Sequence, residues 1–182
     1  WKIYNNSQKL LDLINDMLDL SKLESSRLSL SVDYFDIVEL INEIILELTP
    51  LILEKKHKID FEISNSEIFI ETDRDKIKNA IINLLSNAIK FTPISWIIKI
   101  NCRLDISSIQ IDIIDNWIWI SEENQKMIFE RFGQVKNSLT RDINWTWLGL
   151  PIVKSTIDRL WWNLLLTSSE WNWSTFTIKL PS

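Results

Sequence analysis

Three asparagines and a lysine follow one another at helical spacing along residues 73–93. Asn79, Asn83 and Asn87 recur every fourth residue and Lys90 lies three residues further on, so an α-helix would carry all four on one face. An amide oxygen is a hard ligand that suits Mg²⁺, and a lysine ammonium can meet a phosphate as a point charge. Asparagine is a mediocre helix former, so this stripe requires an explanation. Spacing alone favours the simpler alternative, a solvated polar face.

The apolar residues of the same stretch predict a helix over residues 73–91. They recur at three- and four-residue steps, which is the helical period: Ile77, Ala80, Ile81, Leu84, Leu85, Ala88 and Ile89. Asp73 stands where an N-cap belongs, and Pro93 ends the pattern. One face of this helix would therefore be buried while the asparagine stripe stays accessible.

Helices and strands are mixed along the rest of the chain. We expect helices at 2–28, 38–56, 121–131 and 148–160, and strands at 28–37, 58–64, 67–71, 96–105, 108–115, 164–168 and 175–180. Residues 133–144 carry no pattern and are expected to form a loop. The order predicts an α+β fold, a two-layer α/β sandwich whose mixed, mostly antiparallel sheet has helices on one face, preceded by a long helix.

A second candidate for chemistry lies at the end of an apolar strand. Asp115 follows a strand-like run, and a carboxylate at a strand end is an acceptor that can point into a cleft. The alternative is an Asx turn made with Asn116, which the local sequence favours when taken by itself.

Composition excludes several classes of function. A net charge of −5 argues against a nucleic-acid partner, and there is no apolar run long enough to span a membrane. The single cysteine, Cys102, excludes an internal disulfide and is expected to be a small core residue. The single histidine, His57, excludes a multi-histidine metal site and is expected at the surface near a helix end.

Five segments, in order, resemble the motifs of sensor histidine kinases. Residues 83–92 resemble the N box, 115–119 stand where the family has D-x-G-x-G, and 128–132 resemble the F box. Residues 144–150 stand where the family has G-T-G-L-G-L, and 170–176 where a further G-x-G-[ST] motif is usual. The departure from the family is consistent: tryptophan stands at the glycine positions, in a chain with 10 Trp and 2 Gly.

The resemblance implies the Bergerat ATP-binding fold and a role for each matching residue. Asn87 would bind Mg²⁺ with Asn83 beside it, Lys90 would approach the phosphates, and Phe91 would cover the base. Asp115 would accept a hydrogen bond from the adenine amino group. The remaining residues that the motifs assign to ATP are Trp117, Trp119, Ile120, Thr146, Trp147, Leu148, Gly149, Leu150 and Thr175.

The reaction implied by the resemblance is transfer of the ATP γ-phosphoryl group to a histidine upstream of these residues, with ATP and Mg²⁺ as cofactors. Residues 1–28 would be part of the second helix of the dimerisation and phosphoacceptor hairpin, and residues 29–182 would be the catalytic ATP-binding domain. The expected partners are a second copy, through the N-terminal helix, and the receiver domain of a response regulator. The expected location is the cytoplasm, with a parent protein that could be anchored in the inner membrane.

The tryptophans support a different expectation. Forcing a residue with a Cβ into left-handed geometry costs about 1–2 kcal/mol, and each indole adds bulk to a pocket sized for a nucleotide. The alternative is therefore a nucleotide-dead scaffold of the same fold.

Overall fold

The computed structural model describes residues 30–106, 108–115, 120–130, 149–169 and 173–181. The expected helix at 2–28 and the expected loop at 133–144 lie outside these residues. No helix among the described residues is both long and apolar enough to cross a membrane.

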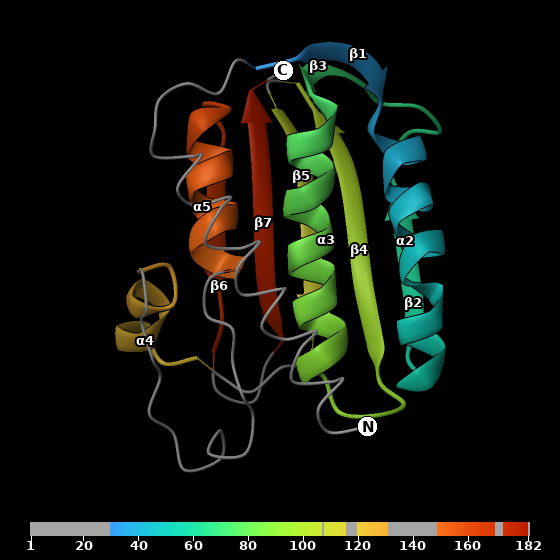
Figure 1. Cartoon of the computed structure of the whole chain (residues 1–182), viewed down its shortest axis with the longest axis vertical. Helices are drawn as coiled ribbons and strands as arrows, with labels where there is room; N and C mark the ends of the chain where they lie inside the picture. The colour runs from blue at the N-terminus through green and yellow to red at the C-terminus, as the bar shows by residue number, and fades with distance from the viewer. Residues whose placement is uncertain (1–29, 107, 116–119, 131–148, 170–172, 182) are drawn as a thin grey trace, which may run out of the picture.

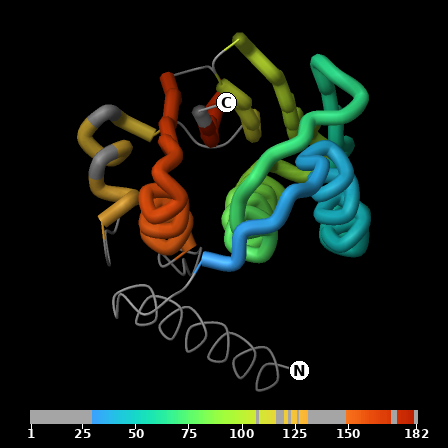
Figure 2. The backbone as a smooth tube through the Cα atoms, turned by 90° about the horizontal axis from the view of Figure 1, so that it is seen from above, coloured from blue at the N-terminus to red at the C-terminus, as the bar shows by residue number. Residues whose placement is uncertain are grey.

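The molecule has two layers, a sheet and a set of helices that cover one of its faces (Figure 1). Seen from above, α2, α3 and α5 all lie on the same side of the strands (Figure 2). The elements in chain order are β1 (Val32–Asp36), α2 (Ile37–Glu54), β2 (Lys58–Ile63), β3 (Phe69–Asp73), α3 (Arg74–Phe91), β4 (Ile97–Asp105), β5 (Ser108–Asp115), α4 (Glu122–Met127), α5 (Gly149–Arg159), β6 (Asn163–Thr167) and β7 (Ser174–Pro181). The predicted α+β sandwich is confirmed.

The main sheet has five strands in the order β2-β4-β5-β7-β6. Strand β2 runs parallel to β4, and every other pair in this sheet is antiparallel. Strands β1 and β3 form a separate antiparallel ribbon. The two strands expected on either side of the Asn65-Ser66 turn therefore belong to different sheets, although both exist near the predicted positions.

The helix that carries the asparagine stripe begins and ends as the sequence predicts. The Asp73 side chain accepts a hydrogen bond from the Lys76 N–H at 3.0 Å, which caps the first turn of α3. All seven of the apolar positions that predict the helix are buried. Helix α2 begins in the same way, because Asp36 accepts from the Val38 N–H.

The core lies between the helices and the inner face of the sheet. Strand β5 contributes Ile109, Ile111 and Ile113, and β4 contributes Cys102, which has no exposed surface. The prediction of a core cysteine is confirmed. Burial, and then the charges of Asp36 and Asp112, raise the pKa of the Cys102 thiol to about 12.

The expectation of a surface position for His57 is wrong. Only 7% of this residue is exposed, and both ring nitrogens lie within hydrogen-bond distance of backbone carbonyl oxygens. The lysines on either side of His57 in the sequence favour an exposed position for it. In the structure Lys56 has a left-handed φ of 55°, and His57, the next residue, is buried.

Helix α5 ends in a left-handed turn that contains tryptophan. Trp161 has a φ of 62°, its N–H donates to the Asp158 carbonyl, and the Trp162 N–H donates to the Ile157 carbonyl. This pair of bonds is the Schellman ending, in which glycine usually takes the left-handed position. Tryptophan at position 161 therefore occupies a backbone conformation that glycine adopts more easily.

Candidate functional site

The asparagine stripe of α3 faces the first residue of α5. Asn83 and Asn87 are half-buried, whereas Asn79, one turn further from α5, is exposed. A Cβ placed on Gly149 would lie 3.4 Å from Asn83 Oδ1 and 3.8 Å from Asn87 Nδ2. Two segments more than sixty residues apart in the sequence thus bring together three residues that the motifs predict.

The α5 N-terminus gives this location its electrostatic character. The first backbone N–H groups of a helix have no partner inside the helix, and the helix dipole adds a partial positive charge there. Gly149 and Leu150 are the first two residues of α5, and both are buried. Pro151 fits the third position, where a missing N–H costs no helical bond. Asparagine amides and a helix N-terminus together suit a metal-bound phosphate.

Lys90 and Phe91 form the last turn of α3. The Lys90 ammonium lies 5.1 Å from the centroid of the Phe91 ring, and Phe91 is half-buried against the core. Lys90 itself is exposed. A cation and an aromatic face therefore lie together at the end of the helix whose side carries Asn83 and Asn87.

Asp115 ends β5 on the inner face of the sheet and has no exposed surface. In the register of β5 and β7 it pairs with Ser174, which is also fully buried. Thr175 pairs with Ile114, and neighbouring residues of a strand point to opposite faces, so Thr175 lies on the other face from Asp115. The structure therefore brings Asp115 together with Ser174 and not with Thr175.

A chain of hydrogen bonds continues from Ser174 through Ser168 to Ile120, at the start of the segment that leads into α4. The Ser174 and Ser168 hydroxyls are 2.9 Å apart, and Ser168 Oγ accepts from the Ile120 N–H at 3.1 Å. Gln125 Nε2 donates to the carbonyls of Ile120 and Ser168, each at 2.9 Å. The predicted residue Ile120 is buried and is held in place by this network.

Ser168 was missed because the sequence contains no spacing signal for it. Ser174 does have a signal, because it occupies the [ST] position of the G-x-G-[ST]-like segment when Trp171 and Trp173 take the glycine positions. The two serines come from different strand ends, and their closeness follows from the pairing of β6, β7 and β5. Trp117, Trp119, Thr146, Trp147 and Leu148 lie outside the described residues.

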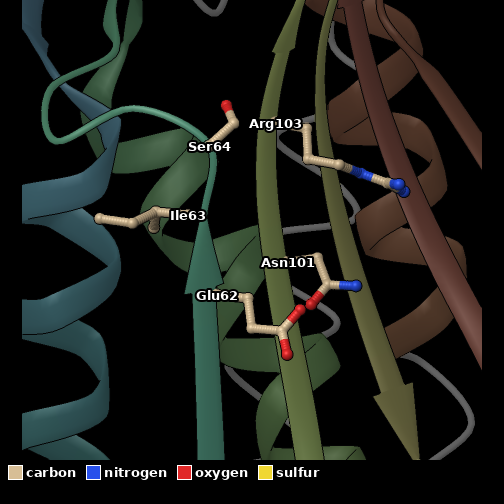
Figure 3. A pocket seen from close by; sticks show the side chains of 5 residues that line it. All are labelled: Glu62, Ile63, Ser64, Asn101 and Arg103. Carbon is tan, nitrogen blue, oxygen red and sulfur yellow. The ribbon is translucent and has the colours of Figure 1, made fainter.

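A hollow of about 200 Å³ lies elsewhere, on the face of the sheet away from the helices. Its lining residues are Glu62, Ile63, Ser64, Asn101 and Arg103 (Figure 3). Arg103 is already ion-paired with Asp112 on β5. Ligand pockets usually measure about 300–1,000 Å³, so this hollow is small for a nucleotide.

The chain is similar to a known ATPase family and to a bacterial sensor kinase. Residues 72–182 match the model of the histidine kinase-, DNA gyrase B- and HSP90-like ATPases. The autoinducer 2 sensor kinase/phosphatase LuxQ of Vibrio vulnificus is 31% identical over 185 residues, which cover 97% of this chain and 21% of LuxQ. The chain thus spans about a fifth of that relative's length.

Solved structures with the same fold include the histidine kinase ThkA. Its nucleotide-free catalytic domain superposes with a TM-score of 0.72 at 27% identity, covering 83% of this chain and 97% of that domain. ThkA in complex with the response regulator protein TrrA gives a TM-score of 0.78 at 25% identity, covering 98% of this chain and 49% of that chain.

Proposed function

The chain belongs to the family of histidine kinase-, DNA gyrase B- and HSP90-like ATPases, and on that premise we propose that it is the ATP-binding catalytic region of a two-component sensor histidine kinase. The phosphoryl acceptor would be a histidine upstream of these residues. The observation that carries the proposal is the approach of the α5 N-terminus to Asn83 and Asn87.

The nucleotide would lie with its phosphates between α3 and α5. The N–H groups of Gly149 and Leu150 would donate to phosphate oxygens, and Lys90 would add a positive charge. Bound ATP supplies the phosphoryl group, and bound Mg²⁺ neutralises charge on the phosphates during transfer. Catalysis by this chain is then mainly positioning and electrostatic stabilisation.

The residues present fit a magnesium ion that is held mainly by phosphate. Mg²⁺ usually keeps several waters and takes only one or two protein ligands beside the substrate phosphates. Asn87 is the proposed ligand, with Asn83 next to it, because both amides lie against the α5 N-terminus. Asn79 is too exposed and too far along the helix to share this role.

The adenine base would lie against the last residue of β5, on the inner face of the sheet. Asp115 would accept from the adenine amino group, and Phe91 would cover the ring. Ser174 and Ser168 would orient the carboxylate through the hydrogen-bond chain that reaches Ile120. We assign Thr175 a role in the strand pairing of this end.

Residues 1–28 would supply part of the dimerisation hairpin, and the phosphoryl group would pass on to a response regulator. The support for the second point is that the similar protein ThkA has been solved with the regulator TrrA. The nucleotide-dead alternative gains no support, because LuxQ, which matches 97% of this chain, is named as a sensor kinase/phosphatase.

Calorimetric titration with ATP, with and without Mg²⁺, tests the proposal. We expect saturable, Mg²⁺-dependent binding, and a Kd at least about tenfold higher for Asn87→Ala, since a ligand of the charged phosphate–metal group is lost. The matched control is Asn79→Ala, on the same stripe but exposed, which should change the Kd less than about twofold. A folded chain that binds no ATP would overturn the proposal, and equal effects of the two variants would overturn the metal assignment.

A further inference from the structure

The buried His57 joins the end of α3 to the start of β4. Its Nε2 lies 3.0 Å from the Ile89 carbonyl oxygen, and its Nδ1 lies 3.2 Å from the Trp96 carbonyl oxygen. The histidine reaches these atoms from the turn after α2, more than thirty residues before Ile89. The ring therefore lies between these two carbonyls, and a hydrogen bond from one of its nitrogens can set the position of the segment that follows α3.

The Ile89 carbonyl needs a donor from outside its own helix. In an α-helix this oxygen would accept from the N–H four residues later, which here would belong to Pro93. Proline has no N–H, so the residue that ends the helix also leaves this carbonyl without its helical partner. The neighbouring Ala88 carbonyl does have a helical partner, because it accepts a hydrogen bond from the Thr92 N–H at 2.9 Å.

These contacts indicate which ring nitrogen carries a proton. The Trp96 carbonyl already accepts from the Lys58 N–H at 3.1 Å. The Ile89 carbonyl has no backbone donor in the helical pattern. A proton on Nε2 therefore satisfies the oxygen that lacks a donor, and leaving such a buried group unpaired would be costly.

We infer that His57 is a positioning residue for nucleotide binding, because it fixes the last turn of α3 through the Ile89 carbonyl. The inference rests on the proposed function, which places Lys90 at the phosphates and Phe91 over the base. Those two residues directly follow Ile89 in the chain. The Ser95 N–H also donates to the Lys55 carbonyl at 3.1 Å, so the segment after the helix is tied down beside the same anchor.

Two isosteric variants separate the roles of the ring nitrogens. The amide nitrogen of glutamine can replace Nε2, whereas that of asparagine can replace only Nδ1. Hydrogen exchange measures the anchor without any nucleotide. We expect His57→Asn to speed exchange of the Lys90, Phe91 and Thr92 amides about tenfold, the equilibrium equivalent of one hydrogen bond, and His57→Gln to restore it. Amides near Ala80 should be unaffected and serve as the internal control.

The Kd for Mg-ATP then measures positioning. We expect His57→Asn to raise the Kd about tenfold and His57→Gln to leave it within about twofold. In a Lys90→Ala background the effect of His57→Asn should shrink, because the histidine acts partly through that lysine. A general loss of stability would not produce this pattern, since both variants can be titrated well below their Tm.

The outcomes are distinguishable. An unchanged Kd in His57→Asn, with normal binding by the unmodified chain, would overturn the positioning role alone. Equal exchange rates in the asparagine and glutamine variants would overturn the anchor. Failure of the unmodified chain to bind Mg-ATP would overturn the proposed function and the positioning role together, while the exchange data would still decide whether His57 holds the turn.

Discussion

Asp115, the last residue of β5, pairs with Ser174, the first residue of β7, and both are buried on the inner face of the sheet. Thr175 lies on the other face. If this end holds the adenine, Asp115→Asn should raise the Kd for Mg-ATP about tenfold, because a charged acceptor is replaced by a neutral one. Isothermal titration of the folded variant measures the change.

Thr175→Val is the matched control for that experiment. It alters a neighbouring residue of the same strand pair on the opposite face, so the Kd should stay within about twofold. A larger effect from Thr175→Val than from Asp115→Asn would reverse the assignment and place the base on the other side of the strand.

Burial of the Cys102 thiol should make the free energy of unfolding depend on pH in the alkaline range. The pKa of its thiol is about 12 in the folded protein and 9.0 in a solvated reference. Above pH 9 the unfolded chain loses this proton while the folded chain keeps it, so stability is fully present below pH 9 and falls as the pH rises toward 12. The expected contribution to the slope is about 1.4 kcal/mol per pH unit. Urea unfolding of the native chain and of Cys102→Ala at several pH values measures it, and equal slopes would contradict it.

Periodicity is informative for residues that act along one element. The Asn83–Asn87–Lys90 stripe was predictable because all three residues lie on one helix. Ser168 and His57 were not, because each owes its position to a partner far away in the sequence. For His57 that partner is the Ile89 carbonyl in the last turn of α3, where Pro93 has no N–H to donate.

The left-handed turn at the end of α5 should lower the stability of the protein. Trp161 is 86% exposed and left-handed, so its side chain gains little from burial while its Cβ strains the backbone. We expect Trp161→Gly to stabilise the protein by about 1 kcal/mol, the strain relieved less the extra freedom of the unfolded chain. Urea denaturation gives the free energy of unfolding.

The adjacent tryptophan is the control. Trp162 is 8% exposed and belongs to the core, so Trp162→Gly should destabilise by about 3 kcal/mol or more. A loss of stability in both variants would show that the left-handed turn is not strained.

The elements themselves were largely predictable, because their signals are local. Asp73 caps α3 at the expected residue, and the strands expected at 96–105 and 108–115 are present as β4 and β5. The partners of β2 and β3 were not predictable. Strand β2 pairs in parallel with β4, although β3 and α3 lie between them in the chain. A parallel pair has no connecting hairpin, so no local turn signal in the sequence predicts it.

At the scale of the whole molecule, the β1–β3 ribbon stands apart from the main sheet. Val32 and Tyr34 on β1 are 54% and 72% exposed, and a two-stranded ribbon has little stability of its own. We expect amides of the ribbon to show hydrogen-exchange protection factors at least about tenfold below those of β5 and β7. Equal protection would mean that the ribbon and the sheet open as one unit.

The order of helices and strands in the sequence was enough to predict the two-layer fold. It was not enough to predict which residues form the candidate site. Its three parts come from α3, the start of α5 and the end of β5, and only their packing brings them together. The family motifs supplied the residues, and the structure added Ser168, Ser174 and His57.

The position of β7 has a consequence for how the protein is made. This strand lies between β5 and β6, yet it is the last of the described strands to leave the ribosome. Until residue 181 has emerged, β5 has an open edge and β6 has no neighbour in the sheet. A nascent chain therefore holds one edge of its central strand open from the synthesis of β5 until that of β7, and a premature stop before Ser174 would remove an internal strand and leave β6 unpaired.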